Sequence, residues 1–209
     1  MATNIVPYEI AELIRRKKAL YCRSADTKQW RRFSEFALPE ATFTFVDALT
    51  PNIPMTEGGQ CMSFSHRVAF LNYSEERNKD LQYIHSVGPG ELYFVDGKDG
   101  KEVKAIWSVI FHVGDGEKTR GFHGTGAGYY HEVWVKVGDD WFIKSLRFER
   151  VYWKACESRY RSAVGARYLG REGLQLCVYA EKTSFPSCFP LPFMALLLPR
   201  ANFSSKLCV

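Results

Sequence analysis

Gly-Tyr-Tyr-His-Glu-Val-Trp-Val-Lys-Val, the run from Gly128 to Val137, is the stretch that decides the fold. Its β-branched and aromatic residues are dense enough to favour a strand over a helix. Gly138-Asp139-Asp140 then provides a tight turn, and apolar residues resume between Trp141 and Trp153. This pattern is typical of an antiparallel hairpin, so the sequence predicts two paired strands here.

Side chains alternate between the two faces of the first predicted strand. Tyr130, Glu132 and Trp134 therefore share one face, while Tyr129 and His131 point the other way. A carboxylate among apolar neighbours either meets partners inside a cavity or faces solvent. The pattern alone leaves both positions of Glu132 open.

The composition is that of a globular protein. The 209 residues are 46% hydrophobic, and this length supports one domain with a tail. The formal net charge is +5, but the basic residues are dispersed. Their densest run, Arg15-Arg16-Lys17-Lys18, lies in a helical pattern, where such a run is usually a solvated face. No basic-aromatic motif accompanies it, which argues against a nucleic-acid partner.

Cysteine spacing and hydropathy argue against a metal site and a membrane segment. The six cysteines show no zinc-like spacing, so we expect free thiols and no metal ligands. The apolar run at 189–198 contains two prolines and is about half of the ~20 residues that a membrane helix needs. No secretory signal is evident at the N-terminus, so we expect a cytoplasmic location.

The rest of the chain predicts an α+β fold, with three N-terminal helices packed on one side of a strongly bent antiparallel sheet. No regular period continues after Trp153, so we expect a domain at 1–154 and an irregular C-terminal extension at 155–209. The patterns predict helices at 7–24, 28–36 and 63–73, the last continuing toward Lys79, strands at 41–46, 81–87, 91–95 and 103–113, and a loop at 47–60.

Acid-base chemistry is what the polar residues permit most readily. The glycine-rich stretch at 121–128 lacks the lysine and the context of a phosphate loop, and its glycines more often bend a strand. No nucleophile elbow occurs. His85 shares a strand face with Tyr83 and Val87, where an imidazole is more often a hydrogen-bonded core residue than a catalyst. Beside a carboxylate such as Asp26 it would be a competent general base.

Several short motifs, taken together, resemble one known group of proteins. They are Ser24-Ala25-Asp26-Thr27-Lys28-Gln29-Trp30, Gln82-Tyr83-Ile84-His85-Ser86-Val87-Gly88, Gly128-Tyr129-Tyr130-His131-Glu132 and Asp140-Trp141-Phe142-Ile143. Their order and spacing are similar to those of the SnoaL-like and scytalone-dehydratase-like group of the nuclear-transport-factor-two-like superfamily. The resemblance covers about residues 8 to 154 and implies a cone of bent sheet wrapped on helices, with a pocket at its open end.

The resemblance also implies roles for individual residues. Asp26 matches the carboxylate that holds the catalytic histidine, His85 matches that histidine, and His112 falls within one position of a second pocket histidine. Ala25 and Phe45 stand where scytalone-type dehydratases have tyrosines, which puts scytalone itself in doubt as substrate. The expected catalytic residues are Asp26, His85, His112, Tyr130 and Glu132, and the expected substrate-binding residues are Trp30, Phe45, Tyr83, Trp107 and Trp134.

The function implied by this resemblance is acid-base catalysis without a cofactor. The substrate would be a mostly apolar, polycyclic natural product of fungal secondary metabolism, and the reaction a dehydration, cyclisation or isomerisation. The resemblance also suggests a homodimer paired through the outer face of the sheet. A non-catalytic member that binds a ligand or protein partner is the alternative, because this fold hosts many activities. Convergence of Asp26, His85 and Glu132 on one cavity would favour the enzyme, and a cavity filled by aromatic side chains would favour the alternative.

Overall fold

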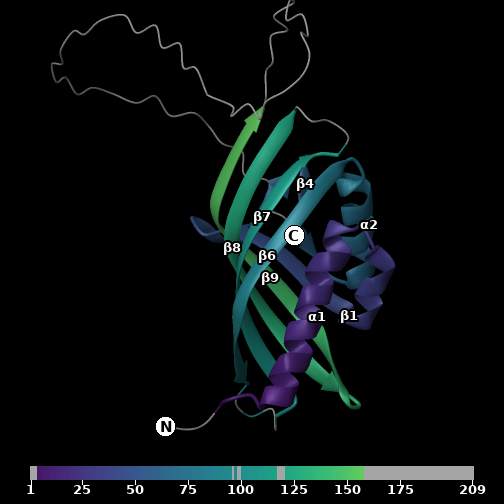
Figure 1. Ribbon diagram of the computed structural model, residues 1–209, viewed down its shortest axis with the longest axis vertical. Coiled ribbons are helices and arrows are strands. Elements are labelled where there is room, and N and C mark those ends of the chain that lie inside the picture. Colours follow the sequence, from purple (N-terminus) through teal and green to yellow (C-terminus); the bar gives the residue numbers. More distant parts are fainter. Residues whose placement is uncertain (1–3, 96, 98–99, 117–120, 158–209) are drawn as a thin grey trace, which may run out of the picture. The chain divides into compact units, whose positions relative to one another are not determined.

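The computed structural model describes residues 4–95, 97, 100–116 and 121–157, and the description below concerns this part of the chain. Two α-helices, α1 (Tyr8–Asp26) and α2 (Arg67–Asn78), and the short 3-10 helix η1 (Trp30–Glu35) lie on one side of a curved sheet (Figure 1). The predicted α+β architecture, with helices gathered on one side of a bent sheet, is confirmed.

The sheet brings the first long strand beside the last. Within the described residues its strand order is β2-β1-β9-β8-β7-β6, β5 also pairs with β1, and β3 and β4 form a separate pair. The strand pairs are antiparallel except for β1 and β9, which run parallel. The bounds are β1 Ala37–Asp47, β2 Thr50–Pro54, β3 Thr56–Glu57, β4 Gln60–Cys61, β5 Ser63–Phe64, β6 Leu81–Phe94, β7 Glu102–Asp115, β8 Phe122–Val137 and β9 Asp140–Glu157.

The predicted hairpin is confirmed as β8 and β9. Its register runs from Val137 opposite Asp140 to Phe122 opposite Glu157, with two irregularities. Tyr130, Glu132 and Trp134 are all buried on the face toward the helices, as the alternation predicts. The solvent-facing alternative for Glu132 is therefore wrong.

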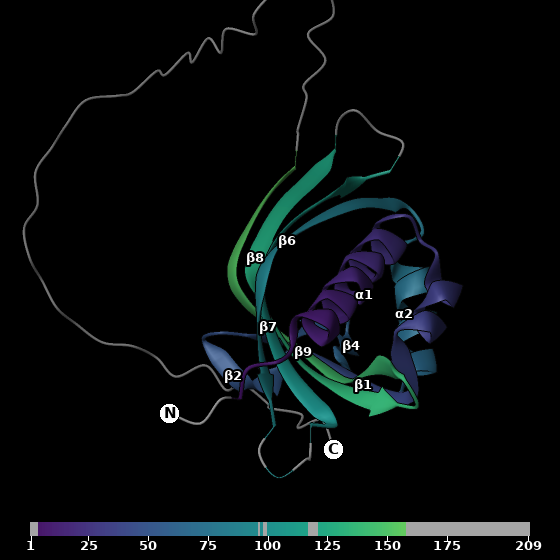
Figure 2. The same ribbon diagram turned by 60° about the horizontal axis from the view of Figure 1, so that its bottom comes forward.

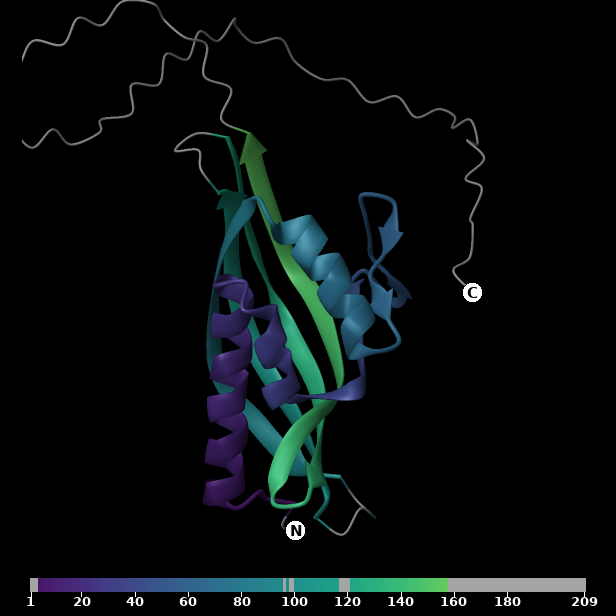
Figure 3. The ribbon, with the colours of Figure 1, turned by 90° about the vertical axis from the view of Figure 1, so that its right-hand side faces the viewer.

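The sheet curves around α1, as Figures 2 and 3 show from two directions. One stripe of this helix packs into the concave face, because residues three and four apart lie above one another on a helix. The buried residues of α1 are Ala11, Ile14, Lys18, Tyr21, Cys22 and Ser24.

The predicted second helix is shorter and tighter than expected. Lys28 has a left-handed backbone, with φ at 57°, and this conformation interrupts the helical path after α1. Only the stretch of η1 then precedes β1, and a segment this short favours 3-10 geometry. Pro39 lies at an exposed position of β1, where the register with β9 shifts.

Three other boundaries also differ from the prediction. The helix expected from residue 63 begins at Arg67, because His66 caps it by accepting a hydrogen bond from the Ala69 N–H at 3.1 Å. The expected loop at 47–60 contains β2, β3 and β4. The two strands expected on either side of Gly88-Pro89-Gly90 form one strand, β6, which absorbs the proline in a bulge.

Strand β9 ends at Glu157. Residues 155–157 belong to β9, and the rest of the expected extension, 158–209, lies outside the described residues. No helix in the described part of the chain is long and apolar enough to cross a membrane.

Candidate active site

The C-terminus of α1 meets β6 through a carboxylate–imidazole pair. Oδ1 of Asp26 lies 2.5 Å from Nδ1 of His85, and Oδ2 of the same carboxylate accepts the backbone N–H of His85 at 3.1 Å. The exposed fractions of the two side chains are 11% and 13%. The contact expected from the resemblance is therefore present, and both carboxylate oxygens of Asp26 hold the histidine.

This pairing determines which nitrogen of His85 is available for chemistry. A neutral imidazole that donates Nδ1–H to Asp26 keeps its lone pair on Nε2. Within the described residues Nε2 has no hydrogen-bond partner. The ring lies between Tyr83 and Phe111, with centroid distances of 6.2 and 5.6 Å. Tyr83 donates its hydroxyl to Asn78, and burial raises the pKa of this phenol well above its usual value.

Glu132 does not join this pair. Its Oε1 lies 2.5 Å from Nζ of Lys18, and its Oε2 accepts the indole N–H groups of Trp107 and Trp134, each at 2.8 Å. The side chains of Lys18 and Glu132 are 1% and 0% exposed. Both carboxylate oxygens are thus occupied inside the core, and the two tryptophans expected to bind substrate are instead the donors to Oε2.

Lys18 is the residue that the sequence reasoning missed. The basic run at 15–18 suggested a solvated face, but Lys18 follows Ile14 by four residues and precedes Tyr21 and Cys22 by three and four. That spacing places it on the buried stripe and could have revealed it. Its ammonium lies 3.5 Å from the centroid of the Tyr130 ring, which adds a cation–π contact.

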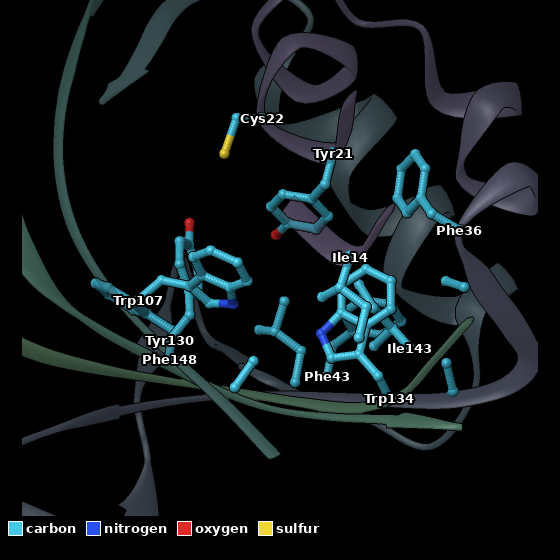
Figure 4. Close-up of a cluster of buried hydrophobic side chains, with 14 of the residues drawn as sticks. Ile14, Tyr21, Cys22, Phe36, Phe43, Trp107, Tyr130, Trp134, Ile143 and Phe148 are labelled. Atoms are coloured by element: carbon cyan, nitrogen blue, oxygen red, sulfur yellow. The ribbon is translucent and has the colours of Figure 1, made fainter. Parts of the chain in front are cut away.

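Tyr130 is also a core residue. Figure 4 shows Tyr21 and Cys22 coming from α1 toward Trp107, Tyr130 and Trp134 of the sheet. Burial, helped by the neighbouring Tyr21, raises the pKa of the Tyr130 phenol well above its usual value. Burial also raises the pKa of the Cys22 thiol to about 11. These groups remain protonated near neutral pH, and they fill the space between Asp26 and Glu132.

The other expected site residues lie in different places. His112 points to the outer face of the sheet, where its Nδ1 lies 2.9 Å from Oγ1 of Thr125 and its ring stacks on His123. Phe45 lies on the concave face and contacts Phe148, Phe64 and Phe70, whereas Trp30 packs on Phe33 in η1.

A surface hollow of about 530 Å³ adjoins the pair at the edge strand β6. Asp26 and Tyr83 line it from the inner side, and Ile84, His112 and His123 line it from the outer side. It is therefore a groove around the sheet edge, lined by Asp26, Tyr83 and His112 among others. Neither His85 nor Glu132 is one of its lining residues. No three or more His, Cys, Asp or Glu side chains of the described residues come together as a metal site.

Comparison with known proteins places the chain among similar sequences and folds. The chain is 47% identical over 146 residues to "Probable cyclase FGR4" from Gibberella zeae. The aligned residues cover 70% of this chain and 94% of that protein. A solved structure named "Putative Scytalone Dehydratase", from Novosphingobium aromaticivorans, has a TM-score of 0.55 at 16% identity and covers 75% of this chain and 94% of its own.

A second solved structure, the hexachlorocyclohexane dehydrochlorinase LinA type 2, has a TM-score of 0.53 at 16% identity and covers 76% of this chain and 99% of its own. These two likenesses concern the fold. The model of the SnoaL-like domain family matches residues 9–147, which is most of the described part of the chain. The chain therefore belongs to the SnoaL-like domain family.

Proposed function

We propose that this domain is an acid-base enzyme that moves protons on a small molecule without a cofactor, with His85 as the base. The observation that carries the proposal is the Asp26–His85 pair, which is nearly buried, held by two contacts and left with one free imidazole nitrogen. A carboxylate in this position fixes the tautomer of the histidine and stabilises the imidazolium that forms. The relative named a probable cyclase supports the same class of chemistry.

The chemistry follows from the free lone pair. Nε2 takes a proton from a carbon next to a carbonyl group, and the electron pair of the broken C–H bond moves into an enolate. In a dehydration the enolate expels a β-hydroxyl group, which leaves as water after receiving the proton from the imidazolium. In a cyclisation the same enolate attacks a second carbonyl group, and the resulting alkoxide receives that proton. Each route returns His85 to its neutral form, and Asp26 stabilises the imidazolium that exists between the two proton transfers.

The proposal also includes the substrate class that the sequence led us to expect. The substrate is a mostly apolar polycyclic natural product, since His85 lies among the aromatic rings of Tyr83 and Phe111. Tyr130 and Glu132, which were expected to be catalytic, are core residues in this scheme and do not touch the substrate.

The test uses 3-hydroxy-1-tetralone, whose loss of water gives 1-naphthol. We expect the wild-type protein to accelerate naphthol formation and deuterium exchange at the α-carbon. Both His85→Gln and Asp26→Asn should lower the rate by about 10²–10⁴-fold, the usual contribution of a positioned base. Their effects should not add, because the two residues act as a unit.

His131→Gln provides a matched control, because His131 lies on the outer face of β8. It should leave the rate unchanged. Full activity in His85→Gln would overturn the assignment of the base. Nitrogen NMR of the imidazole tests the pair without any substrate: the wild type should show the Nδ1–H tautomer, and Asp26→Asn should lose it.

Ligand binding without catalysis is the second candidate, and one observation favours it. Within the described residues, the interior between α1 and the sheet is filled by aromatic side chains, including Tyr21, Phe43 and Tyr130. This candidate would be supported if the protein bound aromatic ketones and His85→Gln changed neither binding nor any reaction.

A further inference from the structure

Two inward-facing glycines of β8 shape the concave surface next to His85. A Cβ atom on Gly126 would lie 2.2 Å from the Cζ of Phe111 and 2.6 and 2.8 Å from its two Cε atoms. Nearly equal distances to both Cε atoms, only slightly longer than that to Cζ, mean that the ring presents its face to the glycine. A Cβ on Gly124 would lie 2.6 Å from the indole ring of Trp153. The glycines therefore leave room for both rings to lie down over β8.

These two rings lie next to each other on the concave side and form what we call the aromatic floor. Phe111 comes from β7 and Trp153 from β9, and their centroids lie 6.1 Å apart with an angle of 30° between the ring planes. His85 borders Phe111 at 5.6 Å, also with an angle of 30°. In the core, by contrast, Tyr21 and Tyr130 meet at 74°. Trp153 is 37% exposed, so part of this aromatic floor is accessible to solvent.

The guanidinium of Arg150 lies over the Trp153 side of the floor. Arg150 precedes Trp153 on β9, shares its inward face, and has its guanidinium carbon 5.9 Å from the Trp153 ring. Its Nε and Nη2 both donate to Oδ2 of Asp47, at 3.2 and 3.0 Å. The side chain is 29% exposed, and Nη1 has no partner within the described residues. Asp47 thus orients the guanidinium and leaves one donor edge available.

We propose that this surface binds planar aromatic molecules that carry an anionic oxygen, a carboxylate or a phenolate, with the ring on Phe111 and Trp153 and the oxygen on Arg150. The inference rests on the proposed function, because it names the substrate class of the same site. A flat aromatic floor selects planar rings, since stacking needs a flat partner. A guanidinium selects an anionic oxygen, because a hydrogen bond between charged groups is stronger than one between neutral groups. Arg150 would then determine specificity, while His85 performs the proton transfer.

The experiment compares 2-naphthoate with its neutral analogue 2-naphthamide by isothermal titration calorimetry on the full chain near neutral pH. We expect tighter binding of the naphthoate. Arg150→Gln should weaken naphthoate binding about tenfold and make the two affinities equal. Arg147→Gln is the matched control, because Arg147 lies on the outer face of the same strand and pairs with Glu149. It should leave both affinities unchanged.

The floor is tested separately from the charge. Trp153→Leu should weaken both probes alike, because it removes a stacking surface and no charge. Tyr152→Leu is its control, since Tyr152 lies on the opposite face of β9. Circular dichroism and thermal unfolding will establish that each variant is folded.

Three results would overturn the inference: equal affinity of the wild type for both probes, a preference for naphthoate that survives in Arg150→Gln, or no binding of either probe by the wild type. His85→Gln should keep the preference for naphthoate, since it leaves the floor and Arg150 in place. Failure of the proposed function would appear in the turnover of the His85 and Asp26 variants, whereas failure of this inference would appear in binding.

Discussion

Glu132→Gln is expected to destabilise the domain strongly, because it removes one charge of a pair that water cannot reach. The side chains of Lys18 and Glu132 are 1% and 0% exposed, and Nζ lies 2.5 Å from Oε1. At an effective dielectric constant of about 20, two unit charges at this distance attract with a gross energy of roughly 6–7 kcal/mol, which desolvation largely offsets. Removing one partner leaves the other charge buried and should cost about 3–5 kcal/mol.

The two charges should also show strong coupling. Lys18→Met removes the ammonium with little change in shape, and the double variant leaves no buried charge while the glutamine oxygen still accepts an indole N–H. We therefore expect the double variant to cost less than the sum of the single variants by about 2 kcal/mol or more.

The assay is urea unfolding followed by far-ultraviolet circular dichroism, because Trp107 and Trp134 contact the pair and would bias a fluorescence signal. Lys144→Met is the control. Lys144 pairs with Glu102 at 2.9 Å, but its side chain is 51% exposed, so the loss should stay below about 1 kcal/mol. Equal costs for Glu132→Gln and Lys144→Met, or strictly additive single variants, would refute the reasoning.

Two further predictions concern ionisation. Because burial raises the pKa of Cys22 to about 11, iodoacetamide at mildly alkaline pH should label the exposed Cys156 and leave Cys22 unmodified in peptide mapping, and equally fast labelling of Cys22 would contradict its burial. The backbone N–H of Leu49 and then Arg150 lower the pKa of Asp47, so Asp47 stabilises the fold above its unfolded pKa of about 3.9 and this contribution is lost as pH falls through the lower folded value. Acid titration of stability should therefore show a gap between the wild type and Asp47→Asn that closes below about pH 4, and a gap that widens in acid would show that the sign is wrong.

Local patterns predicted the strands and their faces. Strict alternation placed Tyr130, Glu132 and Trp134 on one buried face, because a strand has a period of two that few other conformations share. The alternation does not show which distant residues these side chains contact. Glu132 and Lys18 are 114 residues apart in sequence, and nothing local indicates that they meet.

Other elements depended on information that a pattern does not carry. A left-handed backbone usually falls on a glycine, but here it falls on Lys28. The sequence therefore showed no sign of it, and a longer second helix was expected. The contact of Asp26 with His85 came from the resemblance, since the two residues lie on different elements with α2 between them in sequence. The homodimer and the cytoplasmic location stay predictions, although the outer sheet face that would pair exposes Ile110, Tyr129 and Tyr152.

The parallel pairing of β1 with β9 has a consequence for how the chain is made. The ribosome releases residues 37–47 long before residues 140–157, yet these segments are neighbours in the finished sheet. During synthesis the apolar side of β1, including Phe43 and Phe45, stays unpaired with β9 while the intervening hairpins form. Pairing over such a sequence separation is slow, and an unpaired strand of this kind is prone to aggregation. The nascent chain should therefore depend on chaperones until β9 has emerged.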